Sequence, residues 1–189
     1  IEVRERFVFC EEDIKRFVPL LKSNGVQGTI VLSTCNRTEI YFEMEKDDQS
    51  LIFKTIENTL FTYRKVNESA RAHFYHKSNS EVVRHLFRVV SGLDSMALGE
   101  HQIVGQIKNA FTISEKNSFL STVLIRLFNK TFEVGKKVRT ETCINHGAVS
   151  ISYAGVELAG KKLRNLNSHP VLLVGAGQTS ELTLLSLIK

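Results

Sequence analysis

The sequence lacks the features of secreted and membrane proteins. Of its 189 residues none is tryptophan, only two are proline and only three are cysteine. The three cysteines, Cys10, Cys35 and Cys143, are odd in number, widely spaced and without a CxxC pair, which indicates neither a disulfide framework nor a zinc site. A reducing compartment is therefore favoured. No apolar run approaches a bilayer-spanning length and no signal peptide is evident, so we predict a soluble, cytoplasmic protein without membrane contact.

The composition is otherwise that of an ordinary globular chain, with 42% hydrophobic and 24% charged residues. The length fits one domain, or one domain and part of another. A net charge of +5 tolerates an anionic partner such as RNA, although many small proteins reach it without one. Because the chain opens on Ile1 and closes inside an apolar-periodic helix at Lys189, we expect a fragment.

Hydrophobic periodicity predicts an α/β arrangement for the first part of the chain. Residues 11–25 indicate an amphipathic helix with acids in its first turn. The apolar run 28–33 is typical of a buried strand, and the alternating residues 38–44 of a second strand. A further helix over 48–63 and an edge strand over 72–76 complete this part.

From residue 80 the pattern becomes helical. We predict helices over residues 80–91, 101–115, 120–140 and 148–163, followed by a buried strand over 170–174. The fold class is thus α/β: an α+β part with a small antiparallel sheet, a helical subdomain, and the start of a Rossmann-type domain.

Cys35 lies in the short polar connection Thr34-Cys-Asn-Arg37 between the two predicted strands. A thiolate is the reactive form of cysteine, and the cationic Arg37 two residues on favours that form. The alternative is a buried, inert cysteine at a strand end. The polarity of the loop favours the nucleophile, because nothing there requires a small buried hydrophobe.

A glycine-rich polar segment spans residues 91–108, between two predicted helices. Its side chains Glu100, Gln102 and Gln106 suit a small ligand that carries an ammonium and a carboxylate. The alternative is a helix-turn-helix capped by Asp94, and the residues alone leave both open.

A second glycine loop follows the predicted strand 170–174 and opens a helix, as dinucleotide-binding loops do. The match is partial, since Ser180 replaces the third glycine and the residue that would read the ribose falls beyond Lys189. An ordinary strand–turn–helix is the alternative. The candidate cofactor-binding residues are Gly175, Ala176, Gly177, Gln178, Thr179 and Ser180.

Two further features are ambiguous. His85 is a lone helical histidine, which is more often structural than catalytic. Basic residues recur at helical spacing over residues 126–139 and either meet phosphates or form a solvated face. The six histidines show no metal-ligand spacing.

Several motifs, in this order, resemble the glutamyl-tRNA reductase family over nearly all of the chain. The most specific are Val31-Leu-Ser-Thr-Cys-Asn-Arg-Thr-Glu39 and Gly99-Glu100-x-Gln102-Ile103-x-Gly105-Gln106. The others are Val3-Arg-Glu-Arg6, Ser91-Gly-Leu-Asp-Ser95, Val138-Arg-Thr-Glu-Thr142 and Val174-Gly-Ala-Gly177.

The resemblance implies a division of the chain into three parts. Residues 1–145 would be the catalytic, glutamate-binding domain without its first strand, and 146–169 a connecting helix and linker. Residues 170–189 would begin an NADPH-binding Rossmann domain that is truncated here. A C-terminal dimerisation domain would be missing, so a homodimer, and a possible contact with the downstream aminomutase, are expected of the full-length protein.

The resemblance also implies the reaction. Cys35 attacks the ester of glutamyl-tRNA(Glu) to form a glutamyl thioester, and NADPH reduces the thioester to glutamate-1-semialdehyde, the first step of five-carbon tetrapyrrole (haem) biosynthesis. Covalent capture retains the acyl group, and a thioester accepts hydride more readily than an oxygen ester does. We expect this fragment to be incomplete for the reduction.

The residue roles follow from the same resemblance. Thr34, Asn36 and Arg37 belong to the glutamate pocket, with the guanidinium suited to the γ-carboxylate. His85 matches a histidine implicated in activity, where it orients the substrate or assists proton transfer. The other substrate contacts are Ser95, Glu100 (toward the α-ammonium), His101 (through its backbone), Gln102 and Gln106.

Two other functions compete with this interpretation. One is a thiol-dependent acyl hydrolase or aldehyde dehydrogenase-like enzyme, which differs in whether NADPH changes the product. The other is a basic tRNA-binding module in which Cys35 is incidental. Neither accounts for the polar segment around Glu100 together with the glycine loop.

Overall fold

The computed structural model describes residues 2–45, 48–95, 99–100, 102–145, 151–163 and 166–188. The first half comprises α1 (Glu2–Glu5), α2 (Glu11–Ser23), β1 (Gly28–Ser33), β2 (Thr38–Glu43), α3 (Gln49–Arg64) and the 3-10 helix η1 (Glu68–His73). The second half comprises α4 (Ser80–Val90), α5 (Gln102–Lys116), α6 (Thr122–Glu141), η2 (Cys143–Asn145), α7 (Ile151–Leu163), η3 (Leu166–Ser168) and α8 (Gln178–Leu187). The predicted mixture of a small antiparallel sheet and helices is confirmed.

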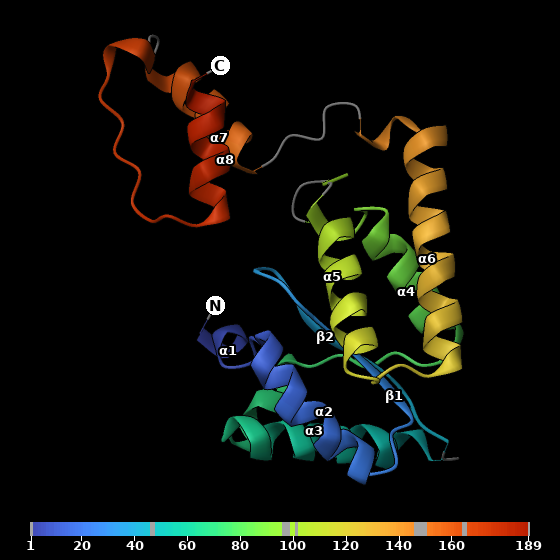
Figure 1. The fold of residues 1–189 in the computed structure, drawn as a ribbon. Coiled ribbons are helices and arrows are strands. Elements are labelled where there is room, and N and C mark those ends of the chain that lie inside the picture. The colour runs from blue at the N-terminus through green and yellow to red at the C-terminus, as the bar shows by residue number, and fades with distance from the viewer. Residues whose placement is uncertain are drawn as a thin grey trace.

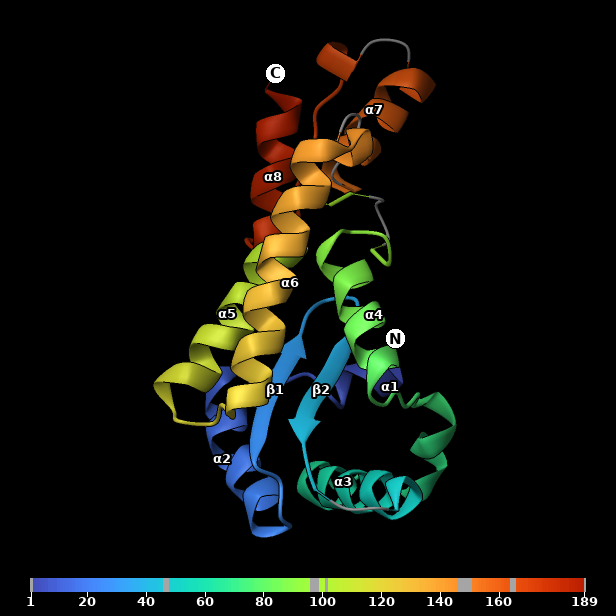
Figure 2. The same cartoon turned by 90° about the vertical axis from the view of Figure 1, so that its right-hand side faces the viewer.

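The strands β1 and β2 form an antiparallel hairpin in the register Gly28↔Glu43 to Ser33↔Thr38. Each face of the hairpin is covered by helices, α2 and α3 on one side and α4 to α6 on the other (Figures 1 and 2). Because strand side chains alternate, the two faces enter different clusters. The α4–α6 side receives Ile30, Leu32 and Tyr41. The α2–α3 side receives Val31, Ile40 and Phe42.

Two glycines permit close packing around this sheet. A Cβ on Gly135 of α6 would lie 2.8 Å from Cγ2 of Val90, so a larger residue there would push α6 away from α4. A Cβ on Gly28 would lie 2.6 Å from Oγ of Ser121, the N-cap of α6. These contacts fix α6 against both α4 and the start of β1.

The predicted edge strand over 72–76 is wrong. Its first two residues, 72 and 73, belong to η1, and the side chains of residues 74–76 contact three different partners. Phe74 packs edge-on against Phe7, Tyr75 binds Glu39, and His76 binds Glu57. An alternation of aromatic side chains without a backbone partner therefore makes an irregular connection, not a strand.

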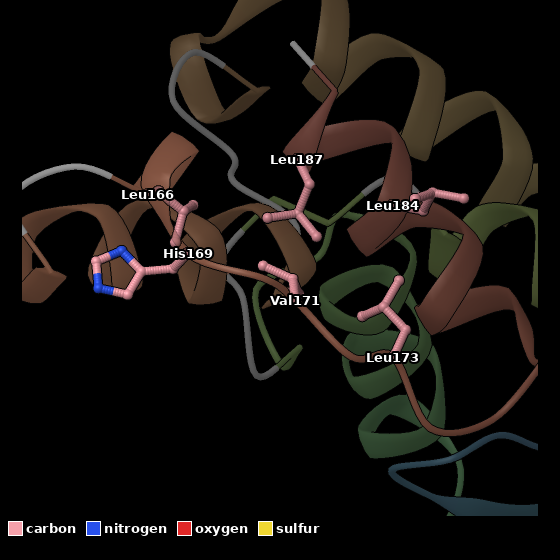
Figure 3. Close-up of a pocket in the computed structure, with 6 residues that line it drawn as sticks. All are labelled: Leu166, His169, Val171, Leu173, Leu184 and Leu187. Carbon is pink, nitrogen blue, oxygen red and sulfur yellow. The ribbon is translucent and has the colours of Figure 1, made fainter.

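The predicted buried strand over 170–174 is also wrong. Residues 170–176 have no regular structure, and Leu172 and Val174 are 86% and 87% exposed. A buried strand needs neighbours for its backbone groups, and no described strand pairs with this segment. Val171 and Leu173 line a pocket to which Leu184 and Leu187 of α8 also contribute (Figure 3).

Candidate active site

The turn between β1 and β2 places Cys35 at its tip. The Thr34 hydroxyl accepts hydrogen bonds from the backbone N–H groups of Asn36, at 3.1 Å, and Arg37, at 3.0 Å. The Thr34 N–H in turn donates to the Arg37 carbonyl at 2.8 Å. This side-chain-closed turn leaves Cys35 and Asn36 exposed. Cys35 is thus accessible to solvent and is not a core residue.

Arg37 connects the hairpin to the loop after α4. Its Nη1 lies 3.0 Å from Oε1 of Glu39, and its Nη2 donates to the backbone carbonyl of Asp94. The side chain is only 13% exposed. The guanidinium that the sequence suggested for a substrate carboxylate is therefore held by a protein carboxylate and a backbone carbonyl.

Glu39 is the centre of the site, and sequence reasoning missed it as a site residue. It faces α4 because it shares a strand face with Tyr41. Its Oε1 accepts from Arg37, from the Tyr75 hydroxyl at 2.5 Å and from Nε2 of His85 at 2.9 Å. Its Oε2 accepts from the Tyr41 hydroxyl. An acid at an inward position of the predicted strand was the sequence signal that could have identified it.

These donors keep Glu39 ionised. Burial raises the pKa of its carboxyl, but hydrogen bonds from His85, Tyr41 and Tyr75, with the charge of His85, outweigh burial and lower the pKa from 4.5 to about 2. Burial, with the hydrogen bond and charge of Glu39, raises the pKa of Tyr75 above its usual 10. Both groups therefore keep the protonation states that the hydrogen bond requires across the neutral range.

His85 lies between two carboxylates. Its Nε2 meets Glu39, while its Nδ1 lies 3.6 Å from Oδ2 of Asp94. Asp94 also accepts from Arg88 at 2.8 Å. The imidazole of His85 and the guanidinium of Arg37 thus share Glu39, which brings the predicted histidine into the same cluster as the hairpin tip.

The loop from residue 91 onward closes back on itself. Gly92 and Gly99 have φ of +73° and +78°, and the Gly99 N–H donates to the Gly92 carbonyl at 3.1 Å. A Cβ on Gly92 would lie 2.9 Å from Cα of Gly99, so this crossing requires glycine. It also brings the backbone of Glu100 close to Gly92, in the loop that follows α4 and carries Asp94.

The remaining predicted ligand residues are half-buried and uncommitted. Ser95, Glu100, Gln102 and Gln106 make no side-chain hydrogen bond or ion pair to another described residue. Gln102 and Gln106 share one face of α5, since they are four residues apart. His101 lies outside the described residues.

The second glycine loop, residues 175–180, precedes and opens helix α8 as predicted, although the strand expected before it is absent from the described residues. Gly175 has φ of +110°, and Gly177 caps α8, where its carbonyl accepts from the N–H groups of Ser180 and Glu181. The Thr179 carbonyl accepts from Ser152 of α7 at 3.2 Å. Gly175, Ala176 and Gly177 are exposed, and Gln178 begins the helix. The hydrogen bonds of this loop among described residues reach α7 and α8, and none reaches Glu39, Arg37 or His85.

The basic residues of α6 are largely engaged. Lys130 pairs with Glu133 at 2.6 Å, and Lys137 lies 3.9 Å from Glu141. Arg139 donates to the Val90 carbonyl at 3.2 Å. Because of these partners, the basic stripe, meaning the basic residues at helical spacing over residues 126–139, lies on a surface of mixed charge. The others in the stripe, Arg126 and Lys136, are exposed.

Comparisons with known proteins agree with this arrangement. Residues 1–142 match a family model described as the N-terminal domain of glutamyl-tRNA(Glu) reductase. A curated glutamyl-tRNA reductase of Chlorobium chlorochromatii (strain CaD3) is 44% identical over 184 residues, which cover 96% of this chain and 43% of that protein. A solved structure of glutamyl-tRNA reductase from Methanopyrus kandleri matches with a TM-score of 0.67 and 35% identity, over 99% of this chain and 43% of that one.

The chain thus spans less than half the length of these two relatives. Within the part of the chain that the structure describes, no helix is long and apolar enough to cross a membrane. No group of three or more described His, Cys, Asp or Glu side chains is arranged to hold a metal ion. Because the family model covers most of the chain and the similarity to both relatives extends along nearly all of it, this chain belongs to the glutamyl-tRNA reductase family.

Proposed function

We propose that this chain carries the acyl-transfer site of a glutamyl-tRNA reductase, with Cys35 as the nucleophile. The observation that carries the proposal is the exposed Cys35 at a rigid turn whose next inward side chain, Arg37, is locked to Glu39. The hydrogen bonds of the turn order the backbone around Cys35, and an exposed thiol two residues from a cationic side chain is suited to attack a carbonyl.

In the proposed first step, the Cys35 thiolate attacks the carbonyl carbon that joins glutamate to the terminal ribose. A carbon–sulfur bond forms as the carbon–oxygen bond breaks, and the ribose oxygen takes up a proton as tRNA leaves. Arg37 would attract the γ-carboxylate of the glutamyl group, and Glu100 its α-ammonium. The uncommitted polar side chains Gln102 and Gln106 would complete the pocket.

His85 would orient this pocket through Glu39. Its two ring nitrogens face Glu39 and Asp94, so it acts on the position of both Arg37 partners, the Glu39 carboxylate and the Asp94 carbonyl. This arrangement favours the orienting role for His85 over direct proton transfer at the thiol.

Residues 175–180 are the proposed holders of NADPH. The open backbone at Gly175 and Gly177 and the start of α8 fit a pyrophosphate, because the helix N-terminus offers N–H groups and no Cβ stands in the way. When bound, NADPH supplies the hydride that converts the thioester to glutamate-1-semialdehyde, the first step of tetrapyrrole biosynthesis. Without it, water would release glutamate, as in the acyl hydrolase alternative.

The proposal is tested by trapping the thioester. The chain is mixed with tRNA carrying labelled glutamate, without NADPH, quenched in acid and digested to locate the label. We expect label on the Cys35 peptide, and its loss in Cys35→Ser. Cys10→Ser and Cys143→Ser are matched controls, since these thiols are also exposed, and should label as the wild type does.

Two outcomes would contradict the proposal. If Cys10 or Cys143 were labelled, and the label persisted in Cys35→Ser, Cys35 would not be the nucleophile. Tight tRNA binding without any adduct would favour the binding-module alternative. The reduction is assayed on a longer polypeptide of relatives' length, where NADPH should change the product from glutamate to the aldehyde.

A further inference from the structure

Tyr75 reaches the candidate site from a segment that the sequence motifs do not include. It lies between η1 and α4, and its hydroxyl donates to Oε1 of Glu39 at 2.5 Å. Its ring meets the His85 ring edge-on, with 5.8 Å between centroids and 68° between planes. The residue is nonetheless 56% exposed and belongs to neither core cluster. Tyr75 therefore forms part of the rim of the site, not of its packing.

The backbone on both sides of Tyr75 is anchored by other residues. Phe74 packs edge-on against Phe7, with centroids 5.1 Å apart. His76 stacks on Phe53 at 4.4 Å, and its Nε2 lies 2.8 Å from Oε1 of the buried Glu57. Two independent anchors thus aim the phenol at Glu39. Removing the hydroxyl alone should leave the segment in place.

We propose that Tyr75 is a positioning residue that holds Glu39 while Arg37 exchanges this carboxylate for the carboxylate of the substrate. This inference rests on the proposed function, in which Arg37 binds the γ-carboxylate of the glutamyl group. In the structure described here Arg37 is committed to Glu39 and to the Asp94 carbonyl. A substrate carboxylate must therefore compete with Glu39 for the same guanidinium.

The exchange is feasible only if Glu39 keeps enough donors. A buried carboxylate that loses its cation without replacement is strongly disfavoured. Glu39 is 6% exposed, and without Arg37 it retains Tyr75 and His85 on Oε1 and Tyr41 on Oε2. Tyr75 and Arg37 donate to the same oxygen, so the Tyr75 hydroxyl still supplies that oxygen with a hydrogen bond when Arg37 leaves. Tyr41 is placed differently, on the other oxygen and inside the core beside Phe128.

The test compares Tyr75→Phe with the wild type in the rate of Cys35 acylation at increasing concentrations of glutamyl-tRNA. We expect the half-saturating concentration to rise roughly five- to tenfold, the effect of one lost hydrogen bond, with the maximal rate changed less than about twofold. The same variant is then assayed with tRNA charged with glutamine, whose neutral amide cannot replace Glu39 as a counter-ion. There Tyr75→Phe should match the wild type.

The matched control is Tyr63→Phe. Tyr63 also directs its phenol to a carboxylate, Asp13, at 3.2 Å, but on the α2–α3 side of the sheet. It should acylate with wild-type kinetics on both substrates. A Tyr75→Phe variant with unchanged kinetics, with a loss of maximal rate alone, or with equal losses on both substrates would overturn the inference. An absence of adduct in the wild type would instead reject the proposed function itself.

Discussion

The carboxylate of Glu39 on β2 accepts a hydrogen bond from Nε2 of His85 on α4, at 2.9 Å. The two residues are 46 positions apart, and this contact joins the hairpin that carries Cys35 to the helix that leads into the glycine-rich segment. It converts two separate motifs into one site. The stability of the contacts that hold this site together therefore depends on the charge of Glu39.

Acidification should weaken the fold through Glu39. Its pKa is about 2 in the folded chain and near 4.5 when unfolded, so its stabilising contribution is complete above about pH 4.5 and is lost as the pH falls toward 2. At about 1.4 kcal/mol per pKa unit, the contribution is about 3 kcal/mol. Urea unfolding between pH 2 and 7 should therefore show wild-type stability falling over this range.

The variant Glu39→Gln isolates this effect. It should be less stable than the wild type at pH 7, and the difference should shrink as the pH falls toward 2, because the wild type then loses the same charge. Glu12→Gln is the control, since Glu12 is an exposed acid whose side chain is 67% accessible and pairs with Lys15 on the surface of α2. A Glu39→Gln difference that stays constant with pH would contradict the depressed pKa.

Arg37→Lys should destabilise the chain, since one ammonium cannot reproduce the fork that joins Glu39 to the Asp94 carbonyl. We expect a loss of about 1–2 kcal/mol in the free energy of unfolding. Arg88→Lys is the comparison, because Arg88 also binds Asp94 but is 53% exposed, and it should change stability by less than about 0.5 kcal/mol. Equal effects in the two variants would mean that Arg37 is only a surface ion pair.

The exposed apolar segment offers a test of the corrected strand. Leu172→Ser should leave the unfolding free energy of this chain within about 0.5 kcal/mol of the wild type, because the side chain is 86% exposed. A buried strand residue would instead lose about 2–5 kcal/mol. Leu86→Ser, on the buried face of α4, supplies the buried reference in the same unfolding measurements.

Helix periodicity and strand alternation were sufficient to predict most elements, because these segments bury one face against a neighbour that the chain itself provides. The helices near 11–25 and 48–63 and both strands of the hairpin are confirmed. The failures share one cause. Residues 72–76 and 170–174 have strand-like composition, but no described strand offers backbone hydrogen bonds to either. The residue composition of a segment does not show whether a partner strand is available to it.

The candidate site was predictable only where a motif marks it. Cys35, Arg37 and His85 were identified from loop polarity and from family resemblance, and the structure brings the latter two together on Glu39. Glu39 and Tyr75 were not selected, because their roles depend on side chains that meet across 36 residues of sequence. A charged residue at an inward strand position was the one available local signal for Glu39.

Two glycine-to-alanine substitutions should have opposite signs. In Gly135→Ala the new Cβ would lie 2.8 Å from Val90, and overpacking between α4 and α6 should outweigh the helix propensity gain, with a net loss of about 1–2 kcal/mol. Gly105 of α5 has no atom within 4 Å of such a Cβ, so Gly105→Ala should stabilise the chain by about 0.5–1 kcal/mol. Thermal or urea unfolding measures both. Adding Val90→Ala to Gly135→Ala should relieve the clash, so that the double variant loses less than the sum of the two single losses. If Gly135→Ala instead raised the melting temperature, the close approach of the two helices would be refuted.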